Sequence, residues 1–175
     1  MDAPQLCGRL CDAGGKTGAD PAVSSTLFII AGLPGVGKST RAAALEAGTG
    51  GVRMEPDAWM DELKLDLWDE DRRASIEAMQ WRLGRRFLAA GLSVIIEWGT
   101  WGRQERLALL EDARALGARV ELIWLTAPAE IMLERVTRRG RESPPITMAQ
   151  IKEWIGLFQV PDADELARYN AVHRH

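Results

Sequence analysis

The sequence has 175 residues, of which 46% are hydrophobic and 27% charged, and its formal net charge at pH 7 is −3. This length suits one domain with a sizeable core, and so balanced a charge gives no overall positive field that would attract nucleic acid. No apolar run approaches the roughly 20 residues of a membrane-spanning helix, and the N-terminus lacks the apolar segment of a signal peptide. We therefore expect a cytoplasmic protein without a membrane partner.

The first 24 residues differ in composition from the rest. Residues 1–24 are rich in Gly, Ala, Asp and Ser without periodicity, which predicts a flexible tail ahead of a single domain over residues 25–175. Both cysteines, Cys7 and Cys11, fall in this tail. A metal site would need more ligands nearby, so we interpret them as free thiols.

A glycine-rich loop follows the first expected strand, at residues 26–31, and precedes a helix that runs to about residue 47. The loop fits the phosphate-loop pattern G-x-x-x-x-G-K-S/T in its required strand–loop–helix context, which favours ATP with Mg²⁺ over a plain turn. Backbone N–H groups would surround the phosphates, Lys38 would reach the β- and γ-phosphates, and the Ser39 hydroxyl would hold Mg²⁺. The residues expected to bind the nucleotide are Gly32, Leu33, Pro34, Gly35, Val36, Gly37, Lys38, Ser39 and Thr40.

The rest of the chain alternates short apolar strands with amphipathic helices. Strands are expected over residues 52–54, 93–97 and 120–125, and helices from residue 58 and over residues 70–90, 104–116, 128–139 and 148–158. One apolar face of the long helix is predicted to contain Ile76, Met79, Leu83, Phe87 and Ala90. The alternation predicts an α/β protein with the three-layer P-loop NTPase fold, a mainly parallel sheet, and ligands at the carboxyl ends of its strands.

Three carboxylates are expected at that edge of the sheet: Glu55, Asp57 and Glu97. A kinase needs one carboxylate to accept the proton of the attacking hydroxyl and another to orient Mg²⁺. We assign the first role to Asp57, which could instead, or in addition, cap the helix that starts at Ala58. Glu97 is expected to support Mg²⁺, with a structural ion pair as the alternative, because an unpaired charge ending an apolar strand is costly. Glu55 is a candidate substrate contact.

Four arginines, Arg135, Arg138, Arg139 and Arg141, lie within seven residues around the end of the helix before residue 140. Phosphoryl transfer spreads negative charge that a closing arginine can stabilise. Residues 138–147 therefore predict an Arg-rich lid, and the first three arginines are candidate catalytic residues. The alternative is a solvated basic helix end that the helix dipole favours.

Seven tryptophans are many for a chain of this length. Trp59 lies two residues after Asp57, and Trp98 and Trp101 follow Glu97. These positions predict an aromatic wall for a ring-bearing acceptor, with ordinary packing as the alternative.

Taken together, these features resemble the small P-loop kinases of the AAA_33-like ATP-binding family, which are related to chloramphenicol phosphotransferase, zeta toxin and polynucleotide kinase. The likeness covers about residues 26–145 and rests on the phosphate loop, Asp57, Glu97 and the run Arg138-Arg139-Gly140 before a Ser/Pro loop. It implies a kinase fold with a base at Asp57. In the polynucleotide kinase branch an arginine usually precedes that aspartate, whereas here the preceding residue is proline.

We therefore expect an ATP-dependent kinase that transfers the γ-phosphate to a hydroxyl of a small molecule such as a nucleoside, sugar or antibiotic. One alternative is a 5′-hydroxyl polynucleotide kinase whose basic channel uses the arginines of the long helix. Another is a regulatory nucleotide-binding protein that has no acceptor.

Overall fold

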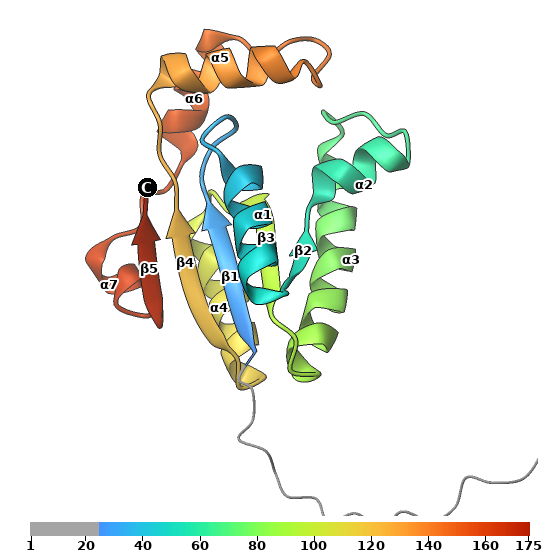
Figure 1. Cartoon of the computed structure of the whole chain (residues 1–175). Helices are drawn as coiled ribbons and strands as arrows, with labels where there is room; N and C mark the ends of the chain where they lie inside the picture. Colours follow the sequence, from blue (N-terminus) through green and yellow to red (C-terminus); the bar gives the residue numbers. More distant parts are fainter. Residues whose placement is uncertain (1–24) are drawn as a thin grey trace, which may run out of the picture.

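Figure 1 shows the chain, of which this computed structural model describes residues 25–175. The expected tail over residues 1–24, with Cys7 and Cys11, lies outside the described residues. Five strands form one fully parallel sheet in the order β2-β3-β1-β4-β5. The strands are β1 Thr26–Ala31, β2 Val52–Met54, β3 Val94–Gly99, β4 Arg119–Trp124 and β5 Ala171–Arg174. The helices are α1 Lys38–Thr49, α2 Pro56–Glu62, α3 Glu70–Ala89, α4 Arg103–Ala115, α5 Ala129–Arg139, α6 Met148–Leu157 and α7 Ala163–Leu166.

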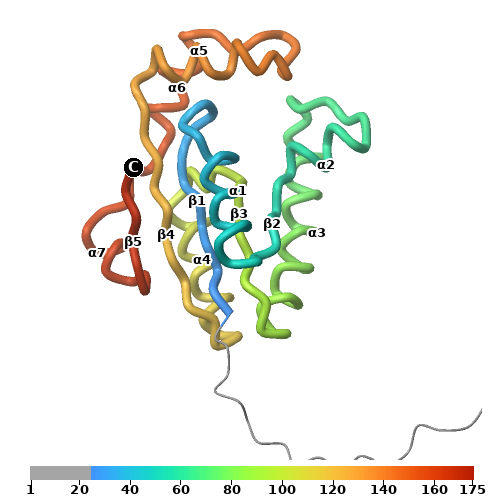
Figure 2. The backbone as a smooth tube through the Cα atoms, in the orientation of Figure 1, coloured from blue at the N-terminus to red at the C-terminus, as the bar shows by residue number. Residues whose placement is uncertain are grey.

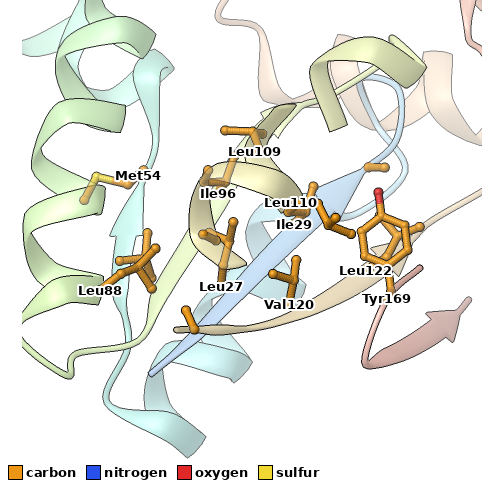
Figure 3. Packing of buried hydrophobic residues seen from close by; sticks show 14 residues of the cluster. Leu27, Ile29, Met54, Leu88, Ile96, Leu109, Leu110, Val120, Leu122 and Tyr169 are labelled. Carbon is orange, nitrogen blue, oxygen red and sulfur yellow. The ribbon is translucent and has the colours of Figure 1, made fainter. Parts of the chain in front are cut away.

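Helices cover both faces of the sheet, because alternate residues of each strand point to opposite faces. Leu27 and Ile29 of β1 belong to the hydrophobic cluster shared with α3 and α4, where Leu110 also packs (Figure 3). Phe28 and Ile30 of the same strand pack in a second cluster with residues of α1, α5 and α6. A strand buried on both faces explains the continuous apolar run, and the predicted three-layer α/β fold is confirmed.

The carboxyl edge of the sheet carries the longest irregular connections. The loop after β1 leads into α1, and α5 crosses above that loop in both views of the backbone (Figures 1 and 2). α2 follows β2 at the same edge of the sheet and packs against α3. This arrangement places the ends of β1, β2 and β3 beside one another.

The predicted apolar face of α3 is confirmed in part, because Ile76 is buried and Leu83 and Phe87 pack against the core, whereas Met79 and Ala90 are exposed. The residues buried in this helix are Ile76, Gln80, Gly84 and Leu88, whereas the Met79 side chain is 42% exposed. Gln80 is buried because it accepts a hydrogen bond of 3.0 Å from Trp98 Nε1. A hydrophobic pattern assigns a polar residue to the solvent side, so it misses a helix face that contains a paired glutamine and a glycine.

Residues 161–175, for which the sequence predicts no helix or strand, complete the sheet. They form α7 and then β5, which lies parallel to β4 with Ala171 opposite Glu121 and Arg174 opposite Trp124. His173 Nε2 lies 3.0 Å from Glu121 Oε2 in this pair of strands. Within residues 25–175, no helix is long and apolar enough to cross a bilayer.

Candidate active site

The loop between β1 and α1 has the backbone of a phosphate cradle. Gly35 and Gly37 have φ values of +83° and +107°, which glycine adopts without strain. A Cβ on Gly35 would also lie 2.5 Å from the carbonyl oxygen of Met132 in α5, so only glycine fits there. α1 begins directly after Gly37, and no described side chain caps it, so its first N–H groups can meet an anion.

The Lys38 ammonium lies inside this cradle. Its Nζ donates a hydrogen bond of 3.1 Å to the carbonyl oxygen of Leu33. Burial lowers the pKa of Lys38 to about 8, although the carboxylates of Asp57 and Glu97 act to raise it. A phosphate beside Nζ would favour the charged amine, so the loop fits the triphosphate of a nucleotide.

A cleft of about 1230 Å³ opens above the loop. Besides the loop, its walls come from the end of β3, from α3, and from α5 and α6. The predicted site residues that line it are Pro34, Gly35, Val36, Gly37, Lys38, Ser39, Thr40, Glu55, Asp57, Glu97, Trp98, Trp101, Arg135, Arg138 and Arg139. Gly32 and Leu33 are buried at the start of the loop, and Trp59 of α2 is not among the residues that line the cleft.

Asp57 faces the cleft but does not cap a helix. α2 begins at Pro56 with Glu55 at the N-cap, so the predicted cap at Asp57 is wrong. Its Oδ1 instead accepts a hydrogen bond of 2.6 Å from Arg73 Nη2 of α3. Burial alone would raise the pKa of Asp57, but the charge and hydrogen bond of Arg73, with further help from Arg141 and Lys38, lower it below its ordinary value.

Glu97 is held in an ion pair at the end of β3. Its Oε2 accepts a hydrogen bond of 2.7 Å from Arg53 of β2, which also lies 3.0 Å from Glu55. Burial and the nearby Glu97 raise the pKa of Glu55, and Arg53 opposes that rise. The structural ion pair that the sequence left open is therefore present. Among residues 25–175, no group of three or more acidic, His or Cys side chains could hold a metal ion by itself.

A Mg²⁺ ion bound with a nucleotide needs few ligands from the protein itself. Ser39, at the first turn of α1, is exposed to the cleft. Mg²⁺ retains several water ligands and is commonly held by one or two protein oxygens together with substrate phosphates. The Ser39 hydroxyl fits this requirement, and Glu97 lines the same cleft.

Of the three candidate arginines, Arg135 contacts the loop most directly. Its Nη1 donates a hydrogen bond of 3.0 Å to the carbonyl oxygen of Gly35. Arg139 pairs with Glu142, and the exposed Arg138 lies 3.7 Å from Glu134. All three line the cleft, so α5 presents cations to the space above the phosphate loop.

The loop after α5 is tied to the opposite wall. Arg141 pairs with Asp61 of α2, although the two residues lie 80 positions apart. Ile146 in the same loop is buried against the core cluster of α1 and α6. The predicted lid segment, residues 138–147, therefore bridges the top of the cleft.

Two tryptophans that the sequence did not single out complete an aromatic cluster. The ring of Trp154 in α6 lies 6.4 Å from that of Trp68 and 5.8 Å from that of Trp101. Trp68, Trp98, Trp101 and Trp154 all line the cleft. The high tryptophan content was the only signal for Trp68 and Trp154, because nothing in their local sequence predicts that they meet.

Thr100 and its neighbours form a tightly held turn after β3. Thr100 has φ of +43°, which is unusual for a β-branched residue, and its side chain is buried. Arg106 of α4 donates hydrogen bonds of 3.0 Å to the carbonyl oxygens of Thr100 and Trp101. The same buried guanidinium contacts Glu165 of α7 at 2.6 Å, so the C-terminal segment supports the wall of the cleft.

The parallel sheet and the phosphate loop define the class of P-loop proteins with a kinase-like fold. Comparison with known proteins identifies the family. A family model described as "AAA domain" (AAA_33) matches residues 27–161, and the chain belongs to this family. The predicted likeness to it is confirmed. No curated protein matches the sequence significantly.

Solved structures share the fold at low sequence identity. A gluconokinase from Sinorhizobium meliloti 1021 is 20% identical with a TM-score of 0.56, over 87% of this chain and 83% of that one. Chaetomium thermophilum Kti12 in complex with ADP-AlF3 is 16% identical with a TM-score of 0.64, over 85% and 88%. A chain of the Pnkp1/Rnl/Hen1 RNA repair complex is 18% identical with a TM-score of 0.65, over 83% of this chain but only 47% of that one.

Proposed function

We propose that this protein is an ATP- and Mg²⁺-dependent kinase that phosphorylates a hydroxyl group of a small molecule such as a nucleoside, sugar or antibiotic. One observation carries the proposal: the phosphate loop and the Asp57 carboxylate line the same cleft. A kinase must hold the donor phosphates and an acceptor hydroxyl in line, and this cleft has room for both. The gluconokinase and other kinases among the similar folds support the same class of reaction.

The proposal gives a part in this reaction to the phosphate loop, Ser39, Asp57, Arg73 and the three arginines of α5. The loop N–H groups and Lys38 bind the β- and γ-phosphates, and Ser39 would hold Mg²⁺, which would supply charge neutralisation. Asp57 accepts the proton of the acceptor hydroxyl while Arg73 keeps it ionised and oriented. Arg135, Arg138 and Arg139 stabilise the charge that develops on the transferred group.

The basic channel that a polynucleotide kinase requires has little support. Of the arginines on α3, only Arg73 lines the cleft, and it is paired with Asp57. Arg85 pairs with Asp112 of α4 at 3.9 Å, on the part of α3 that leads away from the phosphate loop. Strongly salt-dependent binding of an oligonucleotide would favour this alternative.

A thermal-shift screen tests the proposal. The protein is incubated with Mg²⁺ and a non-hydrolysable ATP analogue, and then with a library of hydroxyl-bearing metabolites, antibiotics and oligonucleotides. We expect a compound that raises the melting temperature only when the nucleotide is present. Stabilisation by nucleotide alone, across the whole library, would instead indicate a regulatory nucleotide-binding protein.

A further inference from the structure

Cations and carboxylates are unevenly distributed over the walls of the cleft. The cations come from α1 and α5: Lys38, Arg41, Arg135, Arg138 and Arg139. The walls formed by α2, α3 and α4 contribute the carboxylates of Asp57, Glu70, Glu77 and Glu105, with Arg73 as their one cation among the described lining residues. Glu97, Glu142 and Glu153 line the cleft as well, so carboxylates also lie among the cations, but the wall formed by α2, α3 and α4 is the more acidic one.

Two of these carboxylates lack a close cation. Glu77 Oε1 lies 4.0 Å from Arg73 Nη1, but the shorter contact of Arg73, at 2.6 Å, is to Asp57. Burial raises the pKa of Glu77 to about 7, and the charges of Glu105 and Asp57 add to the rise against Arg73. Glu77 and Glu105 are both half-buried in the wall of the same cleft, and the Arg73 that lies 4.0 Å from Glu77 is shared with Asp57.

Glu105 is also a half-buried carboxyl group in the wall of the cleft. Burial raises the pKa of Glu105, and the opposing influences are a backbone hydrogen bond from Gly102 and the charge of Arg106. Arg106 is not available to pair with it, because its guanidinium is fully buried against Glu165 at 2.6 and 2.9 Å. A cation brought by a ligand would satisfy this carboxyl group and lower its pKa.

Uncharged groups of the same walls also lack partners. Thr100 is 1% exposed and lines the cleft, yet its Oγ1 has no hydrogen-bond partner among residues 25–175. Trp68 lines the cleft as well, and within that part of the chain its Nε1 is buried and unpaired. Buried polar atoms are nearly always paired in folded proteins, so these two atoms of the cleft wall are open to a partner that the described residues do not supply.

From these contacts we propose that the acceptor is an amine-bearing hydroxyl compound, such as an amino sugar or aminocyclitol, whose ammonium group is bound by Glu77 and Glu105. This inference rests on the proposed kinase function and names its substrate class. The carboxylates accept charge-assisted hydrogen bonds from the ammonium group. The tryptophan faces of the cleft pack against the ring and attract the cation.

The same charges disfavour anionic acceptors. A carboxylate-bearing sugar acid or a nucleic-acid phosphate would have to approach Glu77 and Glu105 with only Arg73 to offset the repulsion, and Arg73 already serves Asp57. Specificity for an amine would thus come partly from repulsion of its competitors. The gluconokinase shares the fold, and gluconate, the substrate in its name, is an anionic sugar acid, so the two proteins should differ in acceptor.

A matched set of acceptors tests the inference directly. Calorimetric titration with Mg²⁺ and a non-hydrolysable ATP analogue compares glucosamine, N-acetylglucosamine and gluconate, three derivatives of glucose that are cationic, neutral and anionic. Kanamycin serves as a larger aminocyclitol probe. We expect at least one amine to bind, with an affinity that falls about 10- to 100-fold in Glu77→Gln and in Glu105→Gln. Glu62→Gln, at an exposed position outside the cleft, should leave that affinity unchanged.

The outcomes separate this inference from the proposed function. Nucleotide affinity should stay the same in both glutamine variants, and the melting temperature should not fall, because each variant replaces a carboxyl group whose charge burial disfavours by a neutral amide. Phosphorylation of gluconate or of the neutral sugar, with no binding of either amine, would overturn the amine class and leave the kinase standing. Amine binding without phosphate transfer from ATP would contradict the kinase reaction, and amine binding unaffected by both variants would overturn the assignment of Glu77 and Glu105.

Discussion

Lys38 gives the phosphate loop a pH dependence of its own. Burial lowers its pKa to about 8 in the free protein, whereas a bound triphosphate favours the charged amine and raises that pKa. Above pH 8 the nucleotide must therefore bind together with a proton. We expect the dissociation constant of an ATP analogue to rise about eightfold between pH 7.5 and 9. Calorimetry in buffers of different ionisation enthalpy would measure the proton uptake.

A variant without the amine provides the control for this prediction. Lys38→Met should bind the analogue more weakly at every pH and show no proton uptake between pH 7.5 and 9. Equal proton uptake by the wild type and this variant would assign the titration to another group.

Asp57 is the proposed base and Arg73 lowers its pKa, so variants of the two residues should change different kinetic quantities. Asp57→Asn removes the base and should lower kcat by about 10²–10⁴-fold with little change in nucleotide affinity. Arg73→Gln keeps the base but removes the main influence that lowers its pKa, so the acidic limb of the kcat/KM profile should move to higher pH. Rate profiles from pH 5 to 9 test both, and a near-normal kcat in Asp57→Asn would refute the assignment of the base.

At the level of elements, α5 and the phosphate loop depend on each other. Gly35 has a left-handed φ of +83°, and a Cβ there would lie 2.5 Å from the Met132 carbonyl oxygen. Gly35→Ala should therefore push α5 away, weaken the hydrogen bond from Arg135, and cost about 1–3 kcal/mol of unfolding free energy. Denaturant titration measures the loss, and weaker nucleotide binding should accompany it.

Gly48→Ala is the matched control for that change. Gly48 lies inside α1, and no heavy atom lies within 4 Å of the Cβ it would gain. Alanine favours a helix over glycine, so this variant should be more stable than the wild type by about 0.5–1 kcal/mol. A similar loss in both variants would show that crowding against α5 is not the cause.

At the level of the whole molecule, a buried ion pair joins the C-terminal segment to the cleft. Arg106 and Glu165 have fully buried side chains, and Arg106 also donates to the Gln159 carbonyl oxygen at 2.8 Å. Glu165→Leu leaves a buried guanidinium without its counter-charge and should cost about 3–5 kcal/mol. The double variant Arg106→Met, Glu165→Leu should lose less than the sum of the two single losses.

An exposed ion pair serves as the control that shows whether burial causes the large loss of unfolding free energy. Arg168 and Glu111 lie 2.8 Å apart, but both are largely solvated, with side-chain exposures of 38% and 64%. Glu111→Gln should change the unfolding free energy by no more than about 1 kcal/mol in the same denaturant titrations. Comparable losses for the two pairs would contradict the account of a buried link.

The sequence predicts features that depend on neighbouring residues, but it does not predict contacts that depend on the order of the strands in the sheet. The phosphate loop and the alternation of elements are readable because each depends on neighbouring residues. The ion-pair partner of Glu97 cannot be predicted from the sequence, because Arg53 reaches Glu97 only when β2 lies beside β3. The meeting of Trp68 with Trp154, and the burial of Gln80 under Trp98, likewise depend on contacts between distant elements.

The most direct test of the kinase account is the fate of the γ-phosphate. ATP labelled at that position is incubated with Mg²⁺, the protein and each acceptor, and the label is followed on acceptor and in free phosphate. We predict label on an acceptor hydroxyl, formed by the wild type and lost in Lys38→Ala. Label released only as free phosphate, at the same rate with and without every acceptor, would contradict the account.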